Sequence, residues 1–385
     1  MPRLRRLVHD PVMVPMQRLP TSLTPLDVAL GAVLDGVAPV APVELALAAA
    51  LGRVAAQMPG LNPHPRHDVA AADGWALRAR ELVGASSYSP LRLARPPVWV
   101  EAGDCMPEAC DCVISADSVD QACPIFQVLS EAIPGQGVRR SGADIAEGRS
   151  VIASGQRVRP LDLLIARAAG FEKLQVRCPR LRLVNVPAAS GEAMTAHLIA
   201  DIARAAGADV LITDAAGRDV TSIAAVLEPG GCDLLVTTGG SGVGRTDAAI
   251  AALASCGEVL AHGIALQPGR TAATGRIGNV PVVALPGAPD EAIAAWWTLV
   301  LPVLDRLSGL GPRQKVTLPL QRKIASSVGI AEIVLLERNA DGWLPLAVGD
   351  FGLDTIARSD AWLAVAAGSE GFAAGAPADA YILRD

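Results

Sequence analysis

The stretch Asp233-Leu-Leu-Val-Thr-Thr-Gly-Gly-Ser-Gly-Val-Gly-Arg-Thr-Asp247 decides how the chain is interpreted. An apolar run enters a loop with four glycines, and a helix is expected to begin near Asp247. Glycines let a backbone approach a ligand closely, and a helix that follows points its free N–H groups at the loop. A structural turn explains one or two glycines, but not four. We therefore expect an anion-binding loop formed by Gly239, Gly240, Ser241, Gly242 and Gly244.

This loop matches neither of the two common phosphate-binding patterns. The third glycine of a dinucleotide fingerprint would fall on Arg245 or on Asp247, depending on where the pattern starts. No Gly-Lys-Ser/Thr sequence follows, so it is not a Walker loop either.

Outward from this stretch, strand-like and helix-like segments alternate. Strands are expected at Leu181–Val186, Ala208–Thr213, Asp233–Thr238 and Val280–Leu285. Helices are expected at Ala193–Ala206, Val220–Leu227, Asp247–Ser255 and Glu291–Leu307. Such alternation predicts a parallel sheet with helices on both faces, and ligands bind such sheets at the carboxyl ends of the strands.

Two later loops are expected to join the same site, each at the end of an expected strand. Gln267-Pro-Gly-Arg-Thr271 sets a turn beside a cation, and Leu285-Pro-Gly-Ala-Pro289 precedes a helix. Prolines around a glycine make a loop with preorganised backbone groups. The expected binding residues are Pro268, Gly269, Arg270, Pro286, Gly287 and Pro289.

Two carboxylates near these loops are candidate Mg²⁺ ligands. Asp219 follows the strand-end segment that begins at Asp214, and Asp247 closes the glycine-rich loop. Carboxylates beside a phosphate suit Mg²⁺. Aspartate is also a preferred residue at a helix N-terminus. The two interpretations are equally weighted for Asp219, and the metal interpretation is ahead for Asp247.

The remaining sequence predicts additional domains. Residues 1–20 resemble a loose extension, Pro25–Ala56 is interpreted as helical with a second helix over Pro42–Val54, and short apolar runs then indicate β structure. Gly309–Pro312 resembles a linker, and the last 70-odd residues predict a small barrel or sandwich. The expected division is 21–67 with 134–176 as a discontinuous helical and β linker domain, 68–133 as an inserted β-rich domain, 177–311 as the α/β domain, and 312–385 as a C-terminal β-barrel-like domain.

Composition excludes several function classes. The net charge of −6 and the few aromatic residues oppose nucleic-acid binding. No run of 18 apolar residues lacks charge or proline, so no membrane partner is expected. Seven cysteines without a framework suggest free thiols in a reducing compartment. We expect a cytoplasmic protein.

Six motifs, in order, resemble those of the molybdopterin molybdenumtransferase (MoeA-type) family, which includes the E domain of gephyrin. The resemblance runs from about Thr24 to the C-terminus. The motifs are Asp68-Val-Ala-Ala-Ala-Asp-Gly-Trp-Ala76, Gly103–Val113, Arg140-Ser-Gly-Ala-Asp-Ile145, Thr238–Asp247, Gln267–Arg270 and Leu285–Pro289.

This resemblance implies an elongated, four-part homodimer with its site at the dimer interface. It also implies that the protein binds adenylated molybdopterin, inserts molybdate into its dithiolene with Mg²⁺ present, releases AMP and serves a molybdoenzyme recipient. By that resemblance Asp219 and Asp247 are functional carboxylates. Asp73 and Asp144 are as well, and reach across the dimer.

The chain departs from the family at several polar positions. The family's Thr-Gly-Asp-Glu-Leu loop aligns near Pro187–Ser190, where its aspartate and glutamate are missing. Glu192 takes the place of one of them only if the alignment is shifted. Gln267 replaces the first lysine of the family's Lys-Pro-Gly-Lys motif. Asp350–Gly352 falls where the family has a serine cluster that suits molybdate. Pterin binding is therefore expected to be retained more securely than insertion, and a carrier or delivery protein that does not catalyse insertion is the alternative.

Overall fold

A six-stranded sheet in the second half of the chain positions the candidate site. The computed structural model describes residues 17–122, 125–188 and 193–384. The strand order is β13-β12-β14-β18-β17-β15. The strands are β12 (Arg180–Asn185), β13 (Asp209–Asp214), β14 (Leu234–Thr238), β15 (Glu258–His262), β17 (Ala273–Ile277) and β18 (Val280–Leu285).

The sheet is mixed, whereas the sequence predicted a parallel one. β13, β12, β14 and β18 are parallel, as expected, but β17 and β15 add to the sheet in antiparallel pairing. β17 and β18 form a hairpin through the two residues Gly278 and Asn279, and Gly278 has a φ of 58°. A two-residue turn that contains glycine favours such a hairpin.

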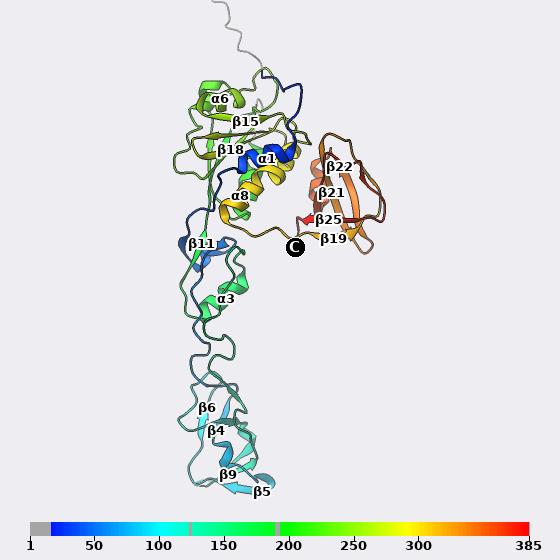
Figure 1. The fold of residues 1–385 in the computed structure, drawn as a ribbon. Coiled ribbons are helices and arrows are strands. Elements are labelled where there is room, and N and C mark those ends of the chain that lie inside the picture. Colours follow the sequence, from blue (N-terminus) through cyan, green and yellow to red (C-terminus); the bar gives the residue numbers. More distant parts are fainter. Residues whose placement is uncertain (1–16, 123–124, 189–192, 385) are drawn as a thin grey trace, which may run out of the picture.

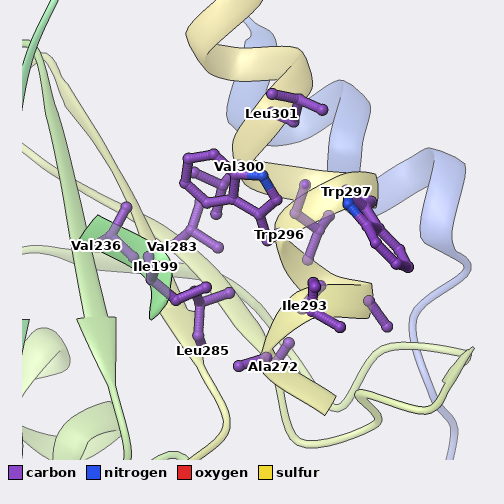
Figure 2. Packing of buried hydrophobic residues seen from close by; sticks show 14 of the residues in the cluster. Ile199, Val236, Ala272, Val283, Leu285, Ile293, Trp296, Trp297, Val300 and Leu301 are labelled. Carbon is purple, nitrogen blue, oxygen red and sulfur yellow. The ribbon is translucent and has the colours of Figure 1, made fainter. Parts of the chain in front are cut away.

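Helices cover both faces of this sheet. They are α1 (Leu26–Leu34), α4 (Met194–Ala205), α5 (Val220–Ala224), α6 (Ala249–Cys256), α7 (Pro289–Ala295), the π-helix η3 (Trp296–Val300) and α8 (Leu301–Ser308). One buried cluster joins α1, α4, α7, η3 and α8 to the sheet, and a second joins α5 and α6 to the other face. Figure 2 shows Trp296 and Val300 on the side of the helix that faces Val283 and Val236 of the sheet, all in the first cluster. None of the described helices is long and apolar enough to cross a membrane.

The chain between α1 and β12 extends away from this sheet (Figure 1). A three-stranded sheet of order β1-β11-β2 lies with two short helices next to it, and two three-stranded antiparallel sheets, β6-β4-β7 and β5-β9-β8, lie at the far end. The nearer elements are β1 (Val43–Ala46), α2 (Leu47–Ala50), β2 (Val54–Ala55), α3 (Pro160–Ala168) and β11 (Lys173–Arg177). The farther ones are β3 (Val69–Ala70), β4 (Gly74–Leu77), η1 (Ala79–Glu81), β5 (Ser86–Arg92), β6 (Val98–Val100), β7 (Cys112–Ile114), η2 (Ala116–Ser118), β8 (Val119–Ala122), β9 (Ile125–Ser130) and β10 (Val138–Arg139), whose pair with β3 packs against β4, β6 and β7.

The predicted helix over Pro42–Val54 is wrong. Only α2, of four residues, is helical there, and β1 precedes it. β1 pairs along its whole length with β11, which is more than a hundred residues away in the sequence. Such pairing overrides the helical preference of an alanine-rich segment.

The last part of the chain forms a second six-stranded sheet. Five of its strands are β19 (Val316–Pro319), β21 (Ala331–Asn339), β22 (Gly342–Val348), β23 (Ala361–Val365) and β25 (Pro377–Ile382). The same part of the chain contains α9 (Leu353–Arg358) and a two-stranded sheet of β20 (Ile324–Ala325) and β24 (Gly371–Phe372). β16 (Leu266–Gln267), from the α/β part, pairs with β21 and so joins this sheet. The ring of Trp362 stacks between Trp297 and Tyr381, with ring centres 5.1 and 4.8 Å away. These contacts attach the C-terminal sheet to the central one.

Candidate functional site

A pocket of about 410 Å³ opens at the carboxyl ends of β12, β14 and β18. This is where open α/β sheets bind ligands, and the volume is typical of a small-molecule site. Its lining residues are Asn185, Val186, Ala188, Ala193–Ala196, Arg218, Thr238–Gly240, Gly242, Asp247, Thr271, Pro286–Pro289 and Glu291.

The glycine-rich loop and the Pro286–Pro289 loop meet in this pocket. Gly239 and Gly240 have φ values of 83° and 70°, which side chains rarely adopt. A Cβ added at Gly239 would lie 3.0 Å from the carbonyl oxygen of Val186. A Cβ added at Gly287 would lie 3.5 Å from the Cα of Gly239. The sequence therefore correctly predicted that these two loops lie together.

The third loop joins them only through its last residue. Thr271 lines the pocket, whereas Pro268 and Gly269 are buried outside it and Arg270 is exposed outside it. The loop does follow a strand, as expected, but that strand is β16, which pairs with β21 of the C-terminal sheet and not with the central sheet. Pro268–Arg270 therefore lie next to the pocket without lining it: a Cβ added at Gly269 would lie 3.2 Å from the carbonyl oxygen of Glu291.

Two of the five residues predicted to bind a ligand in the glycine-rich loop also lie outside the pocket. Ser241 is fully buried, and its hydroxyl has no hydrogen-bond partner among the described residues. Its carbonyl oxygen lies 3.0 Å from Nε2 of His262, a half-buried side chain whose pKa is lowered by burial. Gly244 is exposed, and its N–H donates to Asp247.

The N-terminus of α4 forms one wall of the pocket. Ala193 through Ala196, at the start of this 12-residue helix, line the cavity. The hydroxyl of Thr195 donates to the carbonyl oxygen of Gly287 at 2.6 Å, which fixes the helix against the opposite loop. A helix N-terminus carries partial positive charge and free N–H groups, so this wall favours an anion.

The helix after the glycine-rich loop does not present its N–H groups in the predicted way. Oε1 of Gln17 accepts from the N–H groups of Ile250 and Ala251 at 2.9 and 3.3 Å. Nε2 of the same side chain donates to the carbonyl oxygens of Gly240 and Gly242 at 3.1 and 2.7 Å. The first turn of α6 is therefore capped by the chain itself, and Gln17 is not part of a loose extension.

Arg218 is the side chain that most changes the character of the pocket, and the sequence prediction missed it. Its guanidinium donates to the carbonyl oxygen of Pro187 at 2.8 Å, to Thr246 at 3.1 Å and to Asp247 at 3.0 Å. The Arg218 side chain keeps 30% of its surface exposed. Its place directly after a strand-end turn is the signal that could have identified it.

The two predicted metal ligands differ in their surroundings. Asp219 does not line the pocket. It caps α5, accepting from the N–H and hydroxyl of Ser222 at 3.0 and 2.6 Å, and these hydrogen bonds lower the pKa of its carboxyl. Asp247 does line the pocket and is not a cap, since α6 begins at Ala249 and Asp247 accepts from Arg218 and Gly244. Within the described ranges, no group of three or more His, Cys, Asp or Glu side chains is arranged to hold a metal ion.

Other polar pocket residues were not predicted. Asn185 donates to Asp214 at 2.9 Å and accepts from Thr238 at 3.4 Å, which orders the ends of three neighbouring strands. Glu291 accepts from Thr271 at 3.4 Å, and burial, followed by the charge of Asp290, raises the pKa of its carboxyl. The pocket thus carries one cation, Arg218, and two carboxylates, Asp247 and Glu291.

Asp73 and Asp144 lie away from this pocket in the same chain. Asp73 directly precedes β4, at the far end in Figure 1, and accepts from the N–H of Ala102 at 2.8 Å. Asp144 forms an ion pair with Arg139 at 3.3 Å. Of the segment expected to replace the family's carboxylate loop, Ser190 and Glu192 lie outside the described residues.

Comparisons with known proteins agree with this geometry. Residues 24–170 match the model of the MoeA N-terminal region (domain I and II), and residues 188–306 match that of a probable molybdopterin binding domain. The chain is 29% identical over 344 residues to molybdopterin molybdenumtransferase 2 of Mycobacterium tuberculosis, with 78% of this chain and 79% of that protein covered. It is 28% identical to molybdopterin molybdenumtransferase of Haemophilus influenzae, with 64% and 67% covered. The crystal structure of the molybdopterin biosynthesis MoeA protein of Pyrococcus horikoshii superimposes with a TM-score of 0.73 at 23% identity, covering 94% of this chain and all of that one. This last match shows the same fold.

Proposed function

Because the chain belongs to the molybdopterin molybdenumtransferase (MoeA) family, we propose that it is a transferase of molybdenum cofactor biosynthesis. Its substrates would be adenylated molybdopterin and molybdate, and AMP would be released. The pocket at the ends of β12, β14 and β18 carries this proposal, because it joins two backbone loops, a helix N-terminus and a cation around one cavity. These are the groups that bind a phosphate.

In this proposal the phosphate end of the pterin lies between the start of α4 and Arg218. Main-chain groups of Gly239 and Gly240 approach it closely because they carry no side chains. Arg218 is already oriented by Pro187, Thr246 and Asp247. A preorganised guanidinium loses little freedom when it binds an anion, so the substrate is held in one orientation.

The residues present fit a Mg²⁺ ion in part. Mg²⁺ is commonly bound by one or two carboxylates together with substrate phosphates and water. Asp247 lines the pocket and has lone pairs beyond those used by Arg218 and Gly244, so it would hold the ion; Asp219 does not fit, because Ser222 engages it outside the pocket. When bound, the ion would neutralise phosphate charge.

We also propose that the working unit is a homodimer and that the four-domain division expected from the sequence describes it. Asp73 directly precedes β4, which lies at the opposite end of the elongated chain from β18, so it does not reach the pocket of its own subunit (Figure 1). Asp144 pairs with Arg139 and does not line the pocket either. They would act only if supplied by a second copy. A molybdoenzyme would then receive the product.

One observation favours a second candidate, a protein that binds and delivers the cofactor without inserting the metal. A Cβ added at Gly349 would lie 3.1 Å from Cγ of Gln267 and 2.8 Å from a carboxylate oxygen of Glu332. Gln267 replaces a lysine of the family motif, and Asp350 follows Gly349. The carboxylates of Glu332 and Asp350, next to Gln267 and Gly349, would repel an oxyanion such as molybdate.

Incubation of the protein with adenylated molybdopterin, Mg²⁺ and molybdate tests both candidates. Release of AMP together with formation of active cofactor is the result expected of a transferase. Saturable pterin binding without AMP release would select the delivery protein. Absence of saturable binding would refute both.

A further inference from the structure

Glu291 is the pocket residue whose position the phosphate chemistry does not explain. Its carboxylate is half-buried and lines the cavity. The nearby charge of Arg270 lowers the pKa of this carboxyl by less than burial and Asp290 raise it, and within the described residues the two side chains are not close enough to form an ion pair. Its hydrogen bond to Thr271 is long, at 3.4 Å. A desolvated carboxylate without strong partners is unfavourable, so a ligand that donates hydrogen bonds to it would be bound preferentially.

A purely structural role for Glu291 would be to stabilise the N-terminus of α7. Asp290 occupies the same turn, and an acid at either position interacts favourably with the helix dipole. Neither residue closes a capping box, since Ala288 precedes the helix without a side-chain hydrogen bond. Only Glu291 lines the pocket. The dipole therefore explains an acidic turn, but not a carboxylate directed at the cavity.

Arg218 and Glu291, two of the three charged side chains that line the pocket, follow different strands of the sheet, and the third, Asp247, is paired with Arg218. Arg218 follows β13 and Glu291 follows β18, with β12 and β14 between these strands. Three strand spacings place the ends of β13 and β18 about 14 Å apart. A ligand that extends across the pocket thus meets the guanidinium of Arg218 at one end and the carboxylate of Glu291 at the other, with the start of α4 held against the Gly287 loop.

We infer that Glu291 is a specificity-determining residue that accepts hydrogen bonds from the ring N–H and exocyclic amino group of an aminopyrimidinone, while the phosphate lies toward Arg218. This inference rests on the proposed function, which makes the ligand a phosphorylated pterin. A carboxylate has only acceptors, and its two oxygens match two adjacent N–H donors. A site built in this way rejects an analogue that lacks the donors, because the buried acceptor is then left without a partner.

The test compares two fluorescent ligands on the full-length chain: 6-hydroxymethylpterin diphosphate and its lumazine counterpart, in which a carbonyl replaces the amino group. We expect the wild-type chain to prefer the pterin. Glu291→Gln should weaken pterin binding by about 10- to 100-fold, as expected for loss of hydrogen bonds to a charged group. It should also reduce the preference over lumazine. Asp290→Asn, the matched control in the same turn, should leave both unchanged.

Inorganic pyrophosphate provides the second measurement. Its affinity should be the same in wild type and Glu291→Gln, which shows that the variant is folded and that its phosphate end is intact. Equal pterin affinity and equal selectivity in wild type and Glu291→Gln would overturn the inference while leaving the proposed function in place. If the wild-type chain binds neither pterin nor lumazine, the proposed function fails, and the inference fails with it.

Discussion

The substitution Arg218→Ala gives the sharpest test of how the pocket binds phosphate. The guanidinium is fixed by three hydrogen bonds of 2.8 to 3.1 Å, and its exposed part faces the cavity. Loss of one hydrogen bond to a charged group costs about 1.5–3 kcal/mol, which corresponds to about a 10- to 150-fold rise in Kd. The unpaired carboxylate of Asp247 would then repel the phosphate as well, so the upper half of this range is expected.

Titration calorimetry with inorganic pyrophosphate, at low and at high salt, measures this effect. Arg218→Lys should recover part of the affinity, since lysine keeps the charge but lacks the planar guanidinium that forms the three hydrogen bonds. The double substitution Arg218→Ala with Asp247→Ala should bind more tightly than Arg218→Ala alone, because the repulsive carboxylate is gone. Melting curves establish that each variant is folded. Wild-type affinity in a folded Arg218→Ala protein would refute the assignment.

Three further results are expected. Asp247→Asn should lower Mg²⁺-dependent AMP release. Asp219→Asn should not lower it, because asparagine also caps helices. An equal loss of AMP release in the two variants would make Asp219 a metal ligand again. Burial lowers the pKa of His262 from its usual value of about 6.5, so the unfolded chain binds a proton more readily than the folded one. The free energy of unfolding, measured with urea, should therefore fall as the pH drops from about 7 to about 5.5. His262→Gln should flatten this pH dependence, and an unchanged slope would contradict the assignment to His262. An equal mixture of inactive Asp73→Asn and Asp247→Asn chains, refolded together, should regain about a quarter of wild-type activity, because half of the dimers carry one intact site; no recovery would argue against a shared site.

The sequence predicted the elements whose information is local. The strand at Asp233–Thr238 and the loop after it were correct because an apolar run followed by glycines specifies both. The helix over Pro42–Val54 was not, because a strand partner far along the chain decides that segment. The site was predicted to the same extent. Two strand-end loops were predicted to lie together and do so. Arg218 and Glu291 were not predicted, because they line one pocket only once the separate strands before them pair in one sheet.

The glutamine at position 17 has a practical consequence for anyone who trims this chain. A version that starts after Gln17 would leave two amide hydrogens of α6 without their acceptor and two carbonyl oxygens of the ligand loop without their donor. Shortening of this kind is a routine step toward crystals, and here it would alter the part of the molecule under study. Affinities measured on such a version would describe a ligand loop that lacks its hydrogen bonds to Gln17, so Gln17 should be kept in the shortened chain.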